Sequence, residues 1–229
     1  MIYRKNAIFD LVSDDIAKLL TQGPRLSSMK AQFNCDFPRI GLKVQLSGQL
    51  YQVKEGMKMI IWLIGISGAG KTTIGRKLEA HFNEIGVKNY LLDGDEVRDL
   101  FDRDLGYSDA EREANIKRII LGAYLLDRND IVGIVCNISP LEHLRALARR
   151  KIDGYNEIYL QKDLSISMKN DVKGVYKENA GKTQIVGIDA TFDQPQHPDL
   201  VLEVDKQTEE ETYRAVLDYI VEKYGTQYQ

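Results

Sequence analysis

A glycine-rich segment at residues 65–72 (GISGAGKT) constrains the fold of this chain more than any other feature. It satisfies the pattern G-x-x-x-x-G-K-[ST] at every specified position, and it follows the apolar run at residues 59–64. Ile74, Leu78 and Phe82 then share one face of a predicted helix. A strand, a glycine loop and a helix in this order are the context in which the motif surrounds phosphate groups. The sequence therefore predicts a nucleoside triphosphate site on a phosphate-binding loop.

Each loop position has a chemical reason. Glycines let the backbone curl so that successive N–H groups point inward, and the N-terminus of the following helix adds the positive end of its dipole. We expect Lys71 to reach the β- and γ-phosphates and the Thr72 hydroxyl to bind Mg²⁺. The flanking strand and helix disfavour the alternative of an incidental glycine-rich turn. The expected nucleotide contacts are Gly65, Ser67, Gly68, Ala69, Gly70, Lys71, Thr72 and Thr73.

Composition excludes several classes of protein. The chain has 229 residues, 43% of them hydrophobic and 28% charged, which is typical of a globular domain with an appendage. A formal net charge of −3 gives no basic field for nucleic acid, and no apolar run reaches membrane-spanning length. Cys35 and Cys136 lack metal-binding spacing, and the apolar run around Cys136 favours a small buried side chain. With no signal-peptide pattern, we expect a cytoplasmic protein without nucleic-acid or membrane partners.

Residues 1–56 precede the first strand of the nucleotide-binding domain, which we expect to span residues 57–229. Apolar residues recur at helical spacing between residues 8 and 20, and alternating stretches at 41–46 and 49–53 predict a hairpin. The sequence thus predicts a small N-terminal α+β appendage of unknown function. Because it offers little core of its own, we expect it to dock on the main domain or on a second subunit.

Strands and helices alternate after residue 58. Apolar runs predict strands at residues 59–64, 88–92, 131–138, 156–160 and 200–204. Amphipathic patterns predict helices at residues 71–86, 109–128, 140–151, 163–170 and 207–223. Together they indicate an α/β fold of the P-loop NTPase and nucleotide-kinase kind, with a parallel sheet covered by helices on both faces. Ligand loops lie at the carboxyl ends of such strands, so the segments after residues 64, 92 and 138 are expected to meet in one crevice.

An acidic motif, Asp93-Gly94-Asp95, closes the second predicted strand beside the phosphate loop. Its carboxylates could serve as a general base, as Mg²⁺ ligands or as helix N-caps, and Asp95 alone is a good cap. The neighbouring phosphate loop favours the catalytic interpretation. Lys71, Asp93 and Asp95 are therefore candidate catalytic residues, and Thr72 and Asp93 are candidate metal ligands.

Longer motifs resemble the adenylylsulfate kinase family. The resemblance begins with residues 65–75, with DGDEVR at 93–98 and with DLGYSDAEREANIKRI at 104–119. It continues through NISP at 137–140, DVKGVY at 171–176, GID at 187–189 and HPDL at 197–200. Members of this family transfer the γ-phosphoryl group of ATP to the ribose 3′-hydroxyl of adenosine 5′-phosphosulfate (APS). The resemblance implies this reaction here, with ATP and Mg²⁺ as cofactors and a small nucleotide as acceptor.

The resemblance implies roles on the acceptor side. Arg98, Arg112 and Asn115 would bind the acidic arm of the acceptor, since guanidinium forks bind phosphate and sulfate oxygens bidentately. Tyr107 would stack on the base. A solvated helix face is the alternative for Arg112 and Asn115, because the residues around them are charged. The same resemblance assigns Ile138 to the acceptor.

It also implies roles around the transferred phosphoryl group. Asp93 and Asp95 would orient or deprotonate the attacking hydroxyl and help to hold Mg²⁺. Residues 171–189 would form a mobile lid, in which Lys173 and Lys182 offset charge on the phosphoryl group. Each of these lysines has the alternative of a solvated surface charge.

Ser139 matches a serine that the family records as a phosphorylation site, which makes it a candidate catalytic residue. The residues alone offer another explanation. A serine followed by Pro140 at a strand end is an N-cap with proline at the first helical position. A helix start facing the crevice would also contribute backbone N–H groups to an anionic acceptor.

Four departures from the family pattern concern the substrates. Glu96 replaces the usual asparagine of DGDNVR, and Leu141 and Glu142 replace tyrosine and arginine. The lid reads QIVG at 184–187 in place of K-x-F-T-G, which removes an aromatic face worth about 1–3 kcal/mol. Asn170 replaces an arginine on the ATP side. Since three departures lie on the acceptor side, the sequence indicates the chemistry more firmly than the acceptor.

Three interpretations follow. The first is an ATP-dependent adenylylsulfate kinase. The second keeps the chemistry with another activated nucleotide, such as a cytidine diphosphoramidate in surface-polysaccharide modification, whose smaller base needs less stacking. The third is a nucleotide-binding regulatory protein that has lost its activity, which the intact Lys71, Thr72, Asp93 and Asp95 disfavour. Because members of the family are often dimers, we expect a homodimer.

Overall fold

The structure, a computed structural model, describes residues 32–34, 43–46, 49–52, 58–170, 186 and 190–229. The chain divides into two compact units, Met1–Glu55 and Gly56–Gln229. The predicted helix at residues 8–20 and most of the predicted lid, with Lys173 and Lys182, lie outside the described residues.

The first unit contains a three-stranded antiparallel sheet. Its strands are β1 (Gln32–Asn34), β2 (Lys43–Leu46) and β3 (Gln49–Gln52), in the order β1-β2-β3. Leu46 pairs with Gln49 at the turn between β2 and β3, so the predicted hairpin is confirmed.

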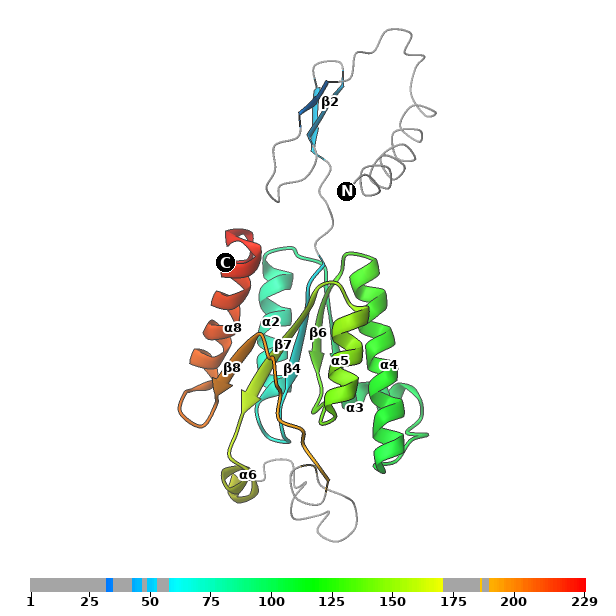
Figure 1. The fold of residues 1–229 in the computed structure, drawn as a ribbon. Coiled ribbons are helices and arrows are strands. Elements are labelled where there is room, and N and C mark those ends of the chain that lie inside the picture. The colour runs from blue at the N-terminus through cyan, green and yellow to red at the C-terminus, as the bar shows by residue number, and fades with distance from the viewer. Residues whose placement is uncertain (1–31, 35–42, 47–48, 53–57, 171–185, 187–189) are drawn as a thin grey trace. The chain divides into compact units, whose positions relative to one another are not determined.

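The second unit is built on a five-stranded parallel sheet (Figure 1). Its strands are β4 (Ile60–Ile64), β5 (Asn89–Asp93), β6 (Val132–Cys136), β7 (Tyr155–Gln161) and β8 (Leu200–Glu203). Their order is β5-β6-β4-β7-β8, and every neighbouring pair is parallel. Strand β4, which leads into the phosphate loop, is therefore central and buried along its whole length. The predicted parallel α/β architecture is confirmed.

Helices cover both faces of this sheet, as Figure 1 shows. On one face α2 (Lys71–Glu84) and α8 (Glu209–Tyr224) pack on alternate β4 residues, with Phe82 and Val216 in the shared core. On the other face lie α3 (Gly94–Leu100), α4 (Asp109–Arg128) and α5 (Glu142–Lys151), which pack around Trp62. The described residues also form α6 (Leu164–Asn170) and the short η1 (Thr226–Tyr228). Among the described residues, none of the helices has the length and apolar character needed to cross a bilayer.

Local sequence explains where most helices begin. Helices α4 and α8 each begin with a capping box. The side chains of Ser108 and Thr208 each accept a hydrogen bond from the backbone N–H of a glutamate three residues on, and that glutamate side chain accepts the backbone N–H of the serine or threonine. Helix α5 begins at Glu142 rather than at residue 140, and Ser139 does not cap it. The predicted Ser139 N-cap is wrong because Asp193 Oδ2 accepts the Glu142 N–H at 2.9 Å.

Helix α2 packs closely on the sheet at Gly75, which gives a stability prediction. Gly75→Ala is expected to lower the free energy of unfolding by about 1–3 kcal/mol, because an added Cβ would overlap Cys136 Sγ and lie 2.9 Å from Leu91 Cδ1. Glycine-to-alanine exchange in a helix otherwise gains about 1 kcal/mol. The control is Gly122→Ala in α4, whose Cβ would meet only methyl groups of Leu92 and which we expect to be neutral or stabilising. Chemical denaturation compares the two, and equal effects would contradict this packing.

Candidate functional site

The predicted crevice forms where the parallel strands end at their carboxyl edge. Strand β4 leads into the phosphate loop, β5 into the Asp93 turn, β6 into residues 137–140 and β7 into Lys162. The register sets these segments side by side, since Asp93 and Leu63 both pair with Cys136. Loops that are distant in sequence thus share one edge of the sheet.

The phosphate loop curls in the way that its glycines predict. Gly70, with φ of 89°, is the left-handed N-cap of α2, a conformation that favours glycine. At Gly65 a Cβ would lie 2.5 Å from the Leu160 carbonyl oxygen, so only glycine fits beside β7. Because Gly70 has no side chain to cap them, the first N–H groups of α2 remain directed at the loop. The arrangement suits a bound phosphate.

Two loop side chains define the reactive end of this site. Lys71 Nζ donates hydrogen bonds to the carbonyl oxygens of Gly65 and Ile66, each at 2.8 Å. Thr72 Oγ1 donates to Asp93 Oδ2 at 2.8 Å. That bond joins the phosphate loop after β4 to the acidic motif at the end of β5, with β6 between these two strands. The other predicted contacts, Ser67, Gly68, Ala69 and Thr73, lie on the same loop and on the first turn of α2.

Asp93 has two roles at this junction. It is buried, and its Oδ1 accepts the Asp95 N–H at 2.9 Å, which caps α3. The predicted cap at Asp95 is therefore wrong, because that residue lies inside the first turn, where its carboxylate is exposed. Asp93 Oδ2 stays beside the Thr72 hydroxyl.

The donor set at Thr72 and Asp93 fits Mg²⁺. This ion prefers hard oxygen ligands and usually takes one or two from the protein, with water and substrate phosphates completing its shell. The hydroxyl and carboxylate oxygens lie 2.8 Å apart at the mouth of the phosphate loop. Within the described residues there is no cluster of three or more acidic, histidine or cysteine side chains that would hold a metal alone. The site thus suits a metal that arrives with a nucleotide.

Three predicted acceptor residues meet at the turn before α4, and two of them, Arg98 and Arg112, are buried. Arg98 NH1 donates to the carbonyl oxygens of Leu105 and Gly106, and its guanidinium lies 4.7 Å from the ring centre of Tyr107. Arg112 Nε donates to the Tyr107 carbonyl oxygen at 2.7 Å. Tyr107 is 43% exposed, although Arg98 lies over its ring.

Burial decides between the two interpretations of the charged helix face. Arg112 and Asn115 are both buried, so the alternative of a solvated face is wrong. Burial lowers the pKa of the Arg112 guanidinium. The nearby positive charge of Arg98 also lowers this pKa, whereas the negative charge of Asp109 raises it. Because both guanidinium groups contact Tyr107, they form a positive site suited to an anion.

Asn115 and Asn137 meet at the backbone of the acidic motif. Asn115 Nδ2 donates to the Gly94 carbonyl oxygen at 3.3 Å, and a Cβ on Gly94 would lie 3.1 Å from Asn137 Oδ1. Asn115 Oδ1 and Asn137 Nδ2 are buried without a hydrogen-bond partner in the described part of the protein. Sequence analysis gave Asn137 no role, although its place at a strand end in the crevice was a usable signal.

Ser139 lies below the surface of the crevice. It is buried, and its Oγ accepts a hydrogen bond from Trp62 Nε1 at 2.8 Å. In this conformation the hydroxyl is not accessible for phosphorylation, while the neighbouring Ile138 is half-buried at the edge of the crevice. Sequence analysis also missed Lys162, which follows β7 and donates to the Gly68 carbonyl oxygen at 2.9 Å.

Two of the departures from the family pattern have a structural account. Glu96 forms an ion pair with Arg76 on the surface of the protein. Glu142 forms an ion pair with the buried Arg145, so its negative charge is compensated within the protein. Neither glutamate stands as an uncompensated charge toward an acidic acceptor.

Comparison with known sequences places the chain among kinases. The family model described as adenylylsulphate kinase matches residues 57–203. The adenylyl-sulfate kinase of Halothermothrix orenii is 41% identical over 165 residues, covering 71% of this chain and 89% of that protein. The probable adenylyl-sulfate kinase of Pyrococcus abyssi is 36% identical, covering 69% of this chain and 91% of that protein.

Comparison with solved structures agrees. The APS kinase of Mycobacterium tuberculosis in complex with AMPPNP and APS has a TM-score of 0.67 and 32% identity, covering 72% of this chain and 99% of that chain. A hexameric APS kinase from Thiobacillus denitrificans has a TM-score of 0.55 and 24% identity, covering 73% of this chain and 30% of that chain, and shows the fold alone. This chain therefore belongs to the adenylylsulfate kinase family.

Proposed function

We propose that this protein is a kinase that transfers the γ-phosphoryl group of ATP to the 3′-hydroxyl of APS. The observation that carries the proposal is the hydrogen bond from Thr72 Oγ1 to Asp93 Oδ2, at 2.8 Å. It puts the carboxylate motif at the reactive end of the phosphate loop, where an acceptor hydroxyl must arrive. The named relatives and the complex with AMPPNP and APS support the choice of substrates.

The donor side binds and neutralises the triphosphate. The loop N–H groups and the N-terminus of α2 bind phosphate oxygens, and Lys71 exchanges its bonds to loop carbonyls for the β- and γ-phosphates. Thr72 and Asp93 would hold Mg²⁺, which would supply positive charge to offset that of the phosphates. Because little covalent chemistry is left for the protein, positioning and charge stabilisation carry the catalysis.

The acidic motif handles the attacking hydroxyl. Asp93 and Asp95 orient the acceptor 3′-hydroxyl, and a carboxylate of this pair takes its proton as the new oxygen–phosphorus bond forms. The bond between the γ-phosphorus and the β,γ-bridging oxygen breaks, and ADP leaves. Asp93 is the better placed of the two, because it is fixed by α3 and by Thr72.

The acceptor lies on the side of α3 and α4. Arg98, Arg112 and Asn115 bind its acidic arm, with Tyr107 stacked on the base. Two buried arginines that both contact Tyr107 suit the phosphosulfate, which carries two negative charges. We further propose Ile138 as an apolar contact at the strand end. We also propose that Lys173 and Lys182 offset charge on the transferred phosphoryl group.

The assembly and location are also proposals. We propose a homodimer, as expected for the family, and a cytoplasmic location. The buried free thiol of Cys136 and the requirement for ATP support the latter.

A coupled ADP-release assay with ATP and Mg²⁺ tests the reaction. With APS we expect turnover at least about 100-fold above the rate without acceptor, since water competes poorly at a site built to position a hydroxyl. Replacing APS with a cytidine diphosphoramidate should give the rate without acceptor. Turnover with the cytidine compound alone would assign a different acceptor, and no turnover with either would contradict a kinase of this type.

A further inference from the structure

The turn between β6 and α5 has a strained backbone at a residue that is not glycine. Ser139 has φ of 48°, in the left-handed region that serine seldom adopts. Such a conformation persists only where surrounding contacts determine it, and such residues cluster at functional sites. The turn follows Asn137, which lies against Gly94 of the acidic motif. The contacts that hold Ser139 therefore bear on the crevice.

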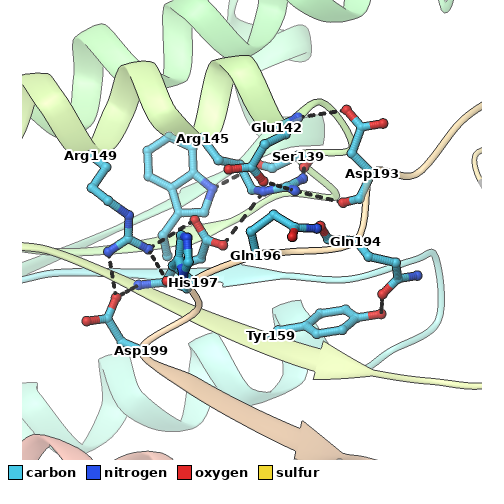
Figure 2. Close-up of polar contacts among 12 residues, drawn as sticks. Ser139, Glu142, Arg145, Arg149, Tyr159, Asp193, Gln194, Gln196, His197 and Asp199 are labelled. Carbon is cyan, nitrogen blue, oxygen red and sulfur yellow. Dashed lines mark hydrogen bonds and ion pairs between the residues drawn. The ribbon is translucent and has the colours of Figure 1, made fainter.

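Arg145 is the main source of these contacts (Figure 2). This arginine is only 2% exposed, although it carries a charge. Its NH1 donates to the Ser139 carbonyl oxygen at 2.7 Å, and its NH2 donates to the Asp193 carbonyl oxygen at 2.7 Å. The same NH2 pairs with the Glu142 carboxylate. One buried guanidinium thus links the strained turn, the start of α5 and the segment before β8.

Asp193 completes the link from the other side. Its N–H donates to the Pro140 carbonyl oxygen at 2.8 Å, and its Oδ2 accepts the Glu142 N–H at 2.9 Å. The carboxylate therefore serves as the cap that α5 lacks within its own sequence. Figure 2 shows Arg145 and Asp193 converging on the turn from α5 and from the segment before β8.

We propose that Arg145 and Asp193 are positioning residues for the acceptor, and the proposal rests on the proposed function. They hold the Ser139–Pro140 turn in its strained form, which fixes Asn137 and Ile138 beside the acidic motif. Neither Arg145 nor Asp193 touches the reacting atoms. Their effect reaches the acceptor through the backbone of the turn, and a small displacement there weakens acceptor binding.

A purely structural ion pair is the competing explanation. Arg145 Nε also lies 3.7 Å from the buried carboxylate of Glu157, and charge compensation alone would justify a buried arginine. Arg149 separates the two explanations. It lies one turn further along α5, and its guanidinium contacts the same Glu157 carboxylate, Asp199 and the His197 carbonyl oxygen, at the far end of the network (Figure 2).

The experiment compares Arg145→Met with the matched control Arg149→Met. Trp62 is the only tryptophan of the chain and its indole donates to Ser139 Oγ, so its fluorescence reports on the turn without any substrate. We expect Arg145→Met to raise acrylamide quenching of Trp62 about twofold and the KM for APS about tenfold, with the KM for ATP within about threefold. Arg149→Met should leave quenching and both KM values within about twofold, while lowering thermal stability. Arg145→Lys should raise the quenching of Trp62 and the KM for APS less than Arg145→Met does.

Asp193→Ala keeps the test decisive if Arg145→Met does not fold. It removes the carboxylate that caps α5 and leaves the backbone contacts of residue 193. We expect the quenching of Trp62 and the KM for APS to rise as in Arg145→Met, each by about half as much on a logarithmic scale. Equal changes in the Arg145 and Arg149 variants would overturn the proposal and leave a structural ion pair. If the wild-type protein did not turn over APS, the proposed function would fail, while the Trp62 comparison would still decide whether Arg145 holds the turn.

Discussion

Asp93→Asn is expected to lower kcat about 1,000-fold while leaving the affinity for an ATP analogue within about threefold. Asparagine keeps one oxygen that can accept the Asp95 N–H, so the cap of α3 survives. The substitution removes the negative charge beside Thr72 and the group that takes the proton. Steady-state ADP release and calorimetric titration with a non-hydrolysable ATP analogue measure the two quantities.

Asp99→Asn is the matched control for this prediction. Asp99 lies on α3, the helix that Asp93 caps, where its carboxylate is exposed and pairs with Arg103 four residues on. We expect kcat to stay within about twofold, because a surface ion pair of this kind contributes little. If Asp93→Asn kept turnover within tenfold of wild type, the assignment of the attacking hydroxyl to this motif would be wrong.

The centre of the sheet was predictable because its inner strands, β4, β6 and β7, are buried on both faces. Such strands appear in sequence as continuous apolar runs between amphipathic helices, and the runs at 59–64 and 156–160 match β4 and β7 closely. Boundaries were less predictable. The run at 131–138 extends past β6, which ends at Cys136, because apolar character does not mark where strand pairing stops. Helix α3 has seven residues, too few for a periodic pattern.

The functional site was predictable where its chemistry is local in sequence. The phosphate loop and the acidic motif are each contiguous in sequence, so their residue types indicate their functions. The cap of α5 was mispredicted because its true partner, Asp193, lies 51 residues beyond Glu142. The bond from Trp62 to Ser139 spans 77 residues and carries no local signal. Local sequence patterns inform on contacts within about one helical turn, whereas these contacts depend on how the chain folds back across the sheet.

The departures from the family pattern show the same limit. In sequence, Glu142 suggested a negative charge on the acceptor side. In the structure, Arg145 compensates that charge from within α5. The position of a residue therefore did not determine its electrostatic effect; its buried partner did. Asp193 and Arg145 tie this pair to the strained Ser139 turn, so the altered positions belong to the support of the crevice as well as to its lining.

Lys71→Met is expected to raise the KM for ATP about tenfold and to lower kcat at least about 100-fold. Methionine keeps most of the length and apolar character of the stem but cannot donate to the β- and γ-phosphates. The loss affects kcat more than binding, because charge on the transferred phosphoryl group develops beyond the ground state. Steady-state kinetics over a range of ATP concentrations separates the two constants.

Lys77→Met, six residues further along the same helix, provides the matched control. Its ammonium pairs with Glu210 on α8, away from the loop, and we expect both constants to stay within about twofold. Lys71 also donates to two loop carbonyls, so a collapsed loop could imitate a lost phosphate contact. Thermal unfolding without nucleotide separates these causes, since collapse lowers the midpoint whereas loss of a phosphate contact only reduces the stabilisation that ATP adds. Unchanged turnover in Lys71→Met would remove the phosphate loop from the mechanism.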